Sequence, residues 1–244
     1  MIRIPILHAG VAEPFPPVAH ALAEPDGLLA AGGDLTPQRL LDAYRHGIFP
    51  WYSEGEPILW WSPDPRMVFA TDRIHVAARL RRWLRHCDWT LRADTAFADV
   101  VRACAAPRHG HAGTWITRAM LDAYQQLHVL GHAHSVEVCD AAGDLVGGIY
   151  GIAIGRMFFG ESMFSRRTNA SKVALIALCR TLRSWRFDLV DAQVSSSHLV
   201  TLGAFEMPRA LFIDHVARAC ALPAQPGSWQ NRWPLTTANA LAGA

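Results

Sequence analysis

Residues 147–193 constrain the fold more than any other stretch of the chain, because elements of different periodicity alternate there. A short turn separates two apolar runs, and a basic loop without glycine precedes a long apolar helix pattern. This order predicts an α/β (α+β) class with a mixed sheet. The expected elements are strands at 145–153 and 157–162, a loop at 166–169, a helix at 170–185 and a strand at 187–193.

Polar side chains end two of these strands. Glu161 ends the second strand, and Asp191 and Gln193 end the last one. Ligands of open sheets bind beyond the carboxyl ends of strands, where a loop meets a helix N-terminus. Asp191 and Gln193 are two residues apart on a strand, so we expect their side chains to face the same side. The sequence therefore predicts that all three converge on one cleft. A buried polar network with a structural role is the alternative.

The N-terminal region differs in composition from the rest of the chain. Pro14, Pro16, Pro17 and Pro25 exclude long helices in this region, and Thr36-Pro37 predicts the start of a helix that ends near Gly47. A chain of 244 residues is long enough for two unequal domains. We place the boundary at the Pro63–Pro65 corner, which gives a small N-terminal domain (1–64) and a larger mixed-sheet domain (65–244). We expect the last strand at 210–215, followed by a Pro- and Gly-containing tail.

Bulky aromatic residues gather on the Pro- and Gly-rich loops between residues 51 and 61. They could form a core between the two domains. Aromatic rings held on such loops also form stacking surfaces for a base. The sequence leaves both interpretations open.

Positive charge is concentrated in two segments. Five arginines and no acid occur between Arg73 and Cys87, and seven basic residues and one acid occur between Arg156 and Arg186. The pattern at 74–86 predicts a helix whose arginines at three-residue spacing share one face. Guanidinium groups match phosphate oxygens bidentately, so these segments predict a phosphate-binding surface. Ordinary solvated helix faces are the alternative.

Several site classes are not expected. The five cysteines are scattered and form no CxxC pair, so the sequence predicts a reducing cytoplasm. No apolar run is long enough to span a bilayer, so no membrane contact is predicted. His109 and His111 have no carboxylate or cysteine at ligand spacing, and we predict no metal site.

The motifs together are more specific than the fold class. The chain resembles the bacterial leucyl/phenylalanyl-tRNA–protein transferase family, in matching order and at compatible spacings from about residue 24 to residue 215. The matching stretches are 24–30 (EPDGLLA), 32–35 (GGDL), 47–51 (GIFPW), 58–66 (ILWWSPDPR), 113–118 (GTWITR), 130–135 (LGHAHS), 160–166 (GESMFSR), 169–172 (NASK) and 202–204 (LGA).

The resemblance implies an activity and its partners. Members move Leu or Phe, and Met less well, from aminoacyl-tRNA to the α-amino group of proteins that begin with Arg or Lys. The product is a destabilising N-terminus that marks the protein for degradation. The resemblance also implies that the larger domain has an acetyltransferase-like (GNAT-like) fold, and it implies no metal or nucleotide cofactor. We expect a cytoplasmic monomer whose partners are Leu-tRNA, Phe-tRNA and the acceptor protein.

The resemblance also implies roles for individual residues. Asp191 would orient the incoming amine, Gln193 would polarise a hydrogen bond, and Glu161 would help to hold the acceptor's positive side chain or α-amine. Whether Asp191 is a general base stays open, because an ordinary carboxylate is a weak base. Trp51 and Trp115 would lie near the 3′-terminal adenosine. A basic helix would hold the tRNA acceptor stem through Arg79, Arg81, Arg82 and Arg85. The donor side chain would enter a deep apolar pocket lined by Ile149, Phe158, Met163, Leu175, Leu178, Leu182 and Val190.

Two other functions compete with this interpretation. A CoA-dependent N-acetyltransferase has the same order of elements, but its loop before the helix is rich in glycine, whereas residues 165–170 contain none. A non-catalytic RNA-binding module would use the tryptophans and arginines. It would leave Glu161, Asp191 and Gln193 without a shared task.

Overall fold

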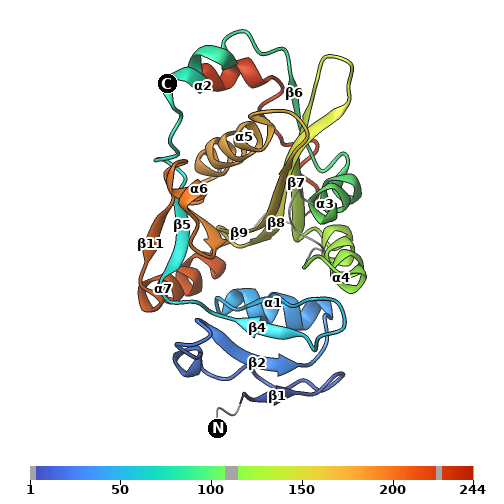
Figure 1. Ribbon diagram of the computed structural model, residues 1–244, viewed down its shortest axis with the longest axis vertical. Coiled ribbons are helices and arrows are strands. Elements are labelled where there is room, and N and C mark those ends of the chain that lie inside the picture. Colours follow the sequence, from blue (N-terminus) through green and yellow to red (C-terminus); the bar gives the residue numbers. More distant parts are fainter. Residues whose placement is uncertain (1–3, 108–114, 224–226, 244) are drawn as a thin grey trace.

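The computed structural model describes residues 4–107, 115–223 and 227–243. Its strands form two sheets, shown in Figure 1. The four-stranded sheet has the order β1-β2-β4-β3, with bounds Ile6–Leu7, Leu28–Gly32, Leu59–Trp61 and Phe49–Pro50. The seven-stranded sheet has the order β11-β5-β10-β9-β8-β7-β6, with bounds Phe205–Met207, Arg66–Ala70, Leu189–Gln193, Met157–Ser165, Leu145–Ile154, Ala133–Cys139 and Thr90–Ala93.

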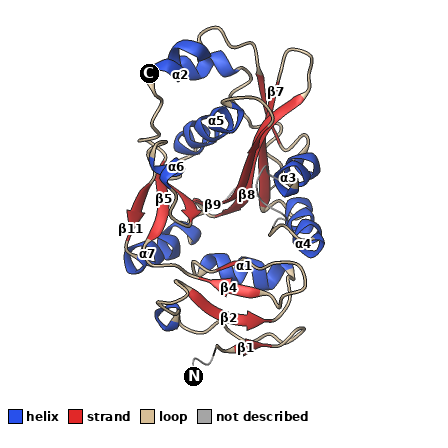
Figure 2. Ribbon diagram, in the orientation of Figure 1, coloured by secondary structure: helices blue, strands red, loops and turns tan. Residues whose placement is uncertain are grey.

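Helices cover both faces of the seven-stranded sheet (Figure 2). Alternate residues of β8 and β9 therefore enter two different cores. Ile149 and Phe158 pack with α5, whereas Tyr150 and Phe159 pack with α3 and α4. The helices are α1 (Pro37–Arg45), α2 (Ala78–Leu84), α3 (Phe97–Ala105), α4 (Arg118–Val129), α5 (Ala170–Ser184), α6 (Ser197–Val200) and α7 (Arg209–Cys220), with 3₁₀ turns at Val18–His20 and Ala238–Ala242.

Helix α1 lies between the four-stranded sheet and the larger part of the molecule (Figure 1). The predicted cap is confirmed, because the hydroxyl of Thr36 accepts a hydrogen bond from the backbone N–H of Arg39 and Pro37 occupies the first turn. Gly47 follows the helix with φ +70°, and a Cβ there would meet the Cδ1 of Ile213 at 2.3 Å. Close packing against α7 therefore requires glycine at this position.

The predicted mixed α/β class is confirmed, and so is the order strand–strand–helix–strand in β8, β9, α5 and β10. The final strand predicted at 210–215 is wrong, because these residues belong to α7. Phe212, Val216 and Ala219 are its buried residues, and their spacing of four and three is helical. The predicted helix at 74–86 is shorter, since α2 spans only Ala78–Leu84.

Strands β9 and β10 separate where the predicted site lies. They pair in parallel only at Phe158–Val190 and Phe159–Asp191, whereas β9 continues to Ser165 beside β8. Beyond Phe159 the two strands therefore border an opening in the sheet that side chains can line.

The described residues include no helix long and apolar enough to cross a membrane. Within the same residues no group of three or more His, Cys, Asp or Glu side chains is arranged to hold a metal ion. His109 and His111 lie outside the described residues.

Candidate active site

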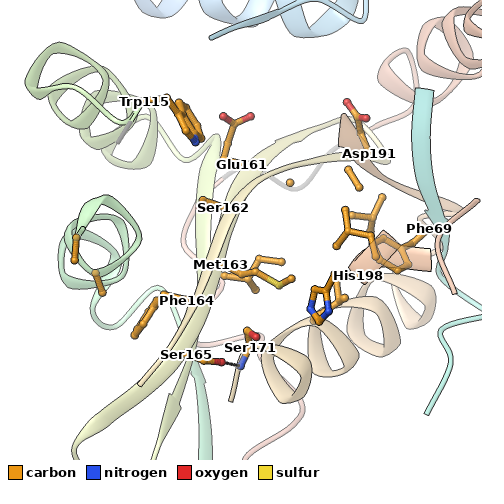
Figure 3. A pocket seen from close by; sticks show the side chains of 18 of the residues that line it. Phe69, Trp115, Glu161, Ser162, Met163, Phe164, Ser165, Ser171, Asp191 and His198 are labelled. Carbon is orange, nitrogen blue, oxygen red and sulfur yellow. Dashed lines mark hydrogen bonds between the residues drawn. The ribbon is translucent and has the colours of Figure 1, made fainter. Parts of the chain in front are cut away.

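A cavity of about 740 Å³ lies between the diverging ends of β9 and β10. Figure 3 shows its labelled side chains from one end to the other. Glu161 and Asp191 lie at one end, together with Trp115, and Phe69, Met163 and His198 border the middle. At the far end the hydroxyl of Ser165 accepts a hydrogen bond from the backbone N–H of Ser171, in the first turn of α5. The cavity is mainly apolar, with the carboxylates at one end.

Glu161 is the extra residue of a β-bulge. On β8, the neighbours Tyr150 and Gly151 pair with Ser162 and Gly160, so Glu161 has no partner across the ladder. Bulges redirect side chains and are common beside active sites. Here the bulge turns the Glu161 carboxylate toward tyrosines from two helices.

Three donors surround this carboxylate. Its Oε1 accepts from the Tyr44 hydroxyl at 2.7 Å and from the Gln193 Nε2 at 2.9 Å, and its Oε2 accepts from the Tyr124 hydroxyl. The two hydroxyls also lie 2.9 Å apart. Tyr44 comes from α1, Tyr124 from α4 and Gln193 from β10. The network therefore joins the small sheet's helix to the large sheet.

The protonation of Glu161 is finely balanced. Burial raises the pKa of Glu161 to about 7, although the hydrogen bonds from both tyrosines and from Gln193 lower it, and the charge of Asp191 raises it further. Three oxygen–oxygen contacts join Glu161, Tyr44 and Tyr124, but the two hydroxyls supply only two hydrogens. A proton on Glu161 supplies the third hydrogen that these three contacts need. This fits a carboxyl group that titrates near neutral pH.

Asp191 has a different environment. It is fully buried, and its carboxylate forms two hydrogen bonds with the guanidinium of Arg66. Because a charged partner already occupies both oxygens, Asp191 is held as one half of an ion pair.

Gln193 connects the two carboxylates. Its backbone N–H donates to the Oδ1 of Asp191 at 2.8 Å, while its side-chain amide reaches Glu161. A second bulge, in which Ala192 is the extra residue, and a φ of +64° at Gln193 make this geometry possible. The regular alternation assumed in the sequence prediction is thus interrupted, and Asp191 and Gln193 direct their side chains to different partners. The structure nevertheless brings all three predicted residues together.

The predicted pocket residues fall into three groups. Five of them line the cavity, namely Trp115, Ile149, Met163, Leu175 and Val190. Phe158, Leu178 and Leu182 do not line it, because they are buried in the core on the α5 face. Trp51 lines a different, smaller cavity together with Phe49, Trp61 and Val194. Val194 directly follows Gln193 in the chain.

Sequence reasoning missed several residues of the site. Arg66 ends the stretch 58–66 that carries the family resemblance. Its position in the sequence does not indicate that it pairs with Asp191, which lies 125 residues further along the chain. Tyr44 and Tyr124 fit the apolar faces of their helices, which is the pattern of core residues. A tyrosine on an apolar helix face is the sequence signal that could have indicated the network, because a buried Tyr hydroxyl usually needs a polar partner. Phe69 and His198 also line the cavity.

The predicted basic helix has one exposed face. Arg79, Arg82 and Arg85 are exposed on and just after α2. Arg81 is half-buried, and its Nε has no hydrogen-bond partner within the described part of the chain. Its charge contributes, after burial, to the lowered pKa of Arg180 on α5.

Comparisons with solved structures give only distant likenesses. L-PGS from Bacillus licheniformis aligns with a TM-score of 0.39 and 9% identity, over 69% of this chain and 54% of that one. A GCN5-related N-acetyltransferase from Kribbella flavida aligns with a TM-score of 0.34 and 13% identity, over 71% and 61% of the two chains. Likenesses of this size support no conclusion.

Comparisons of sequence are decisive. The sequence model described as "Leucyl/phenylalanyl-tRNA protein transferase" matches residues 68–217, and the model of its N-terminal domain matches residues 33–64. A leucyl/phenylalanyl-tRNA–protein transferase from Xanthomonas campestris pv. campestris is 61% identical over 98% of this chain and 96% of its own length. The one from Xylella fastidiosa (strain M23) is 59% identical over 88% and 89%. With matches along nearly its whole length, the chain belongs to the leucyl/phenylalanyl-tRNA–protein transferase family.

Proposed function

We propose that this protein transfers Leu or Phe, and Met less well, from aminoacyl-tRNA to the α-amino group of proteins that begin with Arg or Lys. The new N-terminus marks the acceptor for degradation. The observation that carries the proposal is the network of Glu161, Gln193 and Asp191 at one end of an apolar cavity. Such a site offers a proton acceptor beside a pocket for an uncharged side chain.

The cavity has the properties that a Leu or Phe side chain needs. Ile149, Met163, Leu175, Val190 and Phe69 give it apolar walls, and burial of an apolar side chain there stabilises the bound donor. Trp115 lies at the end where the carboxylates are, which supports a contact with the terminal adenosine while the donor side chain fills the interior.

Glu161 is our candidate for the group that takes up the proton. The acceptor's α-amine must be neutral to attack the ester carbonyl, and its ordinary pKa lies near 7.7–8.0. As the nitrogen–carbon bond forms, the amine loses a proton to Glu161, whose carboxylate the Tyr44 and Tyr124 hydroxyls hold in place. The bond between the carbonyl carbon and the ribose oxygen then breaks, and the proton passes to that oxygen. Atoms and charge balance without a cofactor.

Asp191 and Gln193 act mainly by position in this proposal. Arg66 neutralises Asp191, and Asp191 fixes the backbone of Gln193, whose amide holds the Glu161 carboxylate. The negative charge of Glu161 also favours an acceptor with a positive N-terminal residue. Positioning of this kind suits a reaction whose ester is already activated.

The remaining partner assignments follow from the same site. We propose that the face formed by Arg79, Arg82 and Arg85, with Arg81 beside it, binds tRNA phosphates, which requires exposed guanidinium groups. We place the domain boundary after Asp64 and expect a monomer, since one chain supplies every member of the network. The five cysteines are free thiols in the structure, as in proteins of a reducing cytoplasm.

The test is transfer of radiolabelled Phe from Phe-tRNA to a peptide that begins with Arg, compared with the same peptide beginning with Ala. We expect label on the Arg peptide alone, and a loss of at least about 100-fold in kcat/KM for Glu161→Gln. Absence of label on both peptides, with a folded protein and charged tRNA, would refute the proposal. Acetylation of the same peptide from acetyl-CoA would instead support the rival acetyltransferase.

A further inference from the structure

A second cavity, separate from the candidate active site, has a strongly positive lining. It has a volume of about 360 Å³, which lies within the range of roughly 300–1,000 Å³ typical of small-molecule pockets. Arg45 at the end of α1, Arg156 in the β8–β9 turn and Arg232 in the C-terminal segment all line it. His132 and His134 line it as well. Three segments distant in sequence thus bring three guanidinium groups to one hollow.

Carboxylates do not offset this charge at the lining. No Asp or Glu occurs among the described residues that line the cavity, and no acid follows Asp214 in the sequence. Among the described residues, the side chains of Arg45 and Arg156 form no ion pair or hydrogen bond. Arg45 is close enough to His132 that its charge, after burial, lowers the pKa of that imidazole. Arg45 and Arg156 therefore have no acidic partner among the described residues.

Several contacts hold the walls of the cavity in place. The backbone N–H of Arg156 donates to the carbonyl of Ala219 at 2.9 Å, and a Cβ on the preceding Gly155 would meet that same oxygen at 2.4 Å. The Nδ1 of His134 donates to the Oδ2 of Asp94 at 2.9 Å, and the ring stacks on Trp229, with ring centroids 4.0 Å apart. Arg232 lies over the Trp185 ring at 5.7 Å. A ligand would meet a hollow that is already formed.

Helix capping does not account for these arginines. Three helices, α1, α5 and α7, end at the cavity, and cations near helix C-termini are common. However, backbone N–H groups already bond carbonyls in the last turn of each helix. Those of α1 accept from His46, Gly47 and Ile48, those of α5 from Trp185, Arg186 and Phe187, and Ala219 of α7 accepts from Arg156 and Leu222.

We propose that this cavity binds a phosphate group. Several guanidinium forks around a hollow match the charge and geometry of phosphate oxygens, and the lining offers no competing anion. The phosphate could belong to a small phosphate compound or to a nucleic acid. The inference does not depend on the transferase reaction, because it rests on residues outside that site.

The test uses the full chain and inorganic pyrophosphate in isothermal titration calorimetry. We expect saturable binding at one site, which weakens about tenfold or more in the double variant Arg45→Ala/Arg156→Ala. Arg218→Ala is the matched control, since Arg218 is exposed on α7 but does not line the cavity, and its affinity should stay within about twofold of the parent. No saturable binding, or equal affinity in the double variant and the parent, overturns the proposal.

Two further measurements separate the remaining explanations. The charge-preserving variant Arg45→Lys/Arg156→Lys should lose less affinity than the alanine double variant, because it keeps the charge but not the guanidinium fork. A fold defect would instead weaken binding equally in both double variants and lower both unfolding midpoints. Saturating uncharged tRNA is then added before the pyrophosphate titration. Loss of pyrophosphate binding would identify nucleic acid as the phosphate source, and unchanged binding would identify a small phosphate compound; both results support a phosphate site.

Discussion

Arg66 and Asp191 form a bidentate ion pair inside the protein, with 2.9 Å between Nε and Oδ1 and 2.7 Å between Nη2 and Oδ2. Phe49 and Phe212 flank the guanidinium, each with its ring centroid 4.7 Å away. The remaining Nη1 donates to the carbonyl of Gly47 at 3.0 Å. One side chain thus ties the helix end of the small domain to the strand that carries the proposed site.

Arg66→Ala should strongly destabilise the protein. Removing one partner of a buried pair leaves an uncompensated charge, which costs about 3–5 kcal/mol. We expect that loss in the free energy of unfolding measured with urea. The double variant Arg66→Ala/Asp191→Ala should lose less than the sum of the two single variants, because it leaves neither charge unpaired. Strict additivity would show that the pair is not coupled.

Glu161→Gln should change how stability depends on pH. The unfolded carboxyl group has its ordinary pKa of 4.5, and the folded one has a pKa of about 7, so the folded state binds more protons between these values. The contribution of Glu161 to stability is therefore fully present below pH 4.5 and is lost as pH rises through 7. The loss amounts to about 3 kcal/mol.

Urea unfolding of parent and Glu161→Gln at pH 5, 6, 7 and 8 checks this expectation. The difference in unfolding free energy between the two proteins should shift in favour of the variant as pH rises, since glutamine has no charge to bury. Other titrating groups cancel in this difference. A difference that does not vary with pH would mean that Glu161 titrates at its ordinary pKa in the folded protein.

Tyr44→Phe should shift the pH profile of transfer. The Tyr44 hydroxyl stabilises the Glu161 carboxylate, so its removal raises the pKa of Glu161 and moves the acid limb of kcat/KM to higher pH, by up to about one unit. Tyr150→Phe is the control, because the Tyr150 hydroxyl is buried nearby without a hydrogen-bond partner among the described residues. If both variants shift the profile equally, the hydrogen bond is not the cause.

The regular elements of this fold could be predicted because their periodicity is strong. The long apolar pattern of α5 and the adjacent strands β8 and β9 are examples. Residues 210–215 were misassigned because Leu211, Phe212 and Ile213 form a short apolar run, which fits a strand as well as a buried helix turn. Only packing against α1 and the sheet decides between them.

The site could be predicted in part for similar reasons. Polar residues at predicted strand ends indicated Glu161, Asp191 and Gln193. The predicted end at residue 162 is wrong, because β9 continues to Ser165 and Glu161 lies inside it. The two bulges that direct these side chains have no sequence signal here. Leu178 and Leu182 share a helix stripe with Leu175, yet they lie about 4.5 and about 10.5 Å further along α5 at a rise of about 1.5 Å per residue. The cavity lies at the N-terminal end of α5, so it contacts Leu175 and leaves the other two in the core.

Leu175→Ala and Leu178→Ala should therefore have different effects. Leu175 lines the cavity, so its truncation enlarges the donor pocket and should change the ratio of kcat/KM for Leu-tRNA and Phe-tRNA by roughly 10-fold. Leu178 is fully buried in the core, and its truncation should cost about 2–5 kcal/mol of stability and leave that ratio unchanged. A changed ratio in Leu178→Ala would extend the pocket beyond the cavity described here.

The exposed arginines of α2 should determine the salt dependence of tRNA binding. Arg79→Ala/Arg82→Ala/Arg85→Ala removes three charges from one face without disturbing the core, because all three side chains are exposed. Each lost phosphate contact reduces the slope of log affinity against log salt by about 0.7–0.9, so the triple variant should lose about 2–3 from the slope and bind weakly at low salt. Filter binding of tRNA at salt concentrations from roughly 50 to 200 mM measures both the slope and the affinity.

The matched control for net charge is the triple variant Arg102→Ala/Arg118→Ala/Arg218→Ala, because these arginines are exposed on α3, α4 and α7. Equal slopes for the two triple variants would mean that α2 attracts tRNA only through net charge, whereas a loss confined to the α2 variant would assign the phosphate contacts to that face.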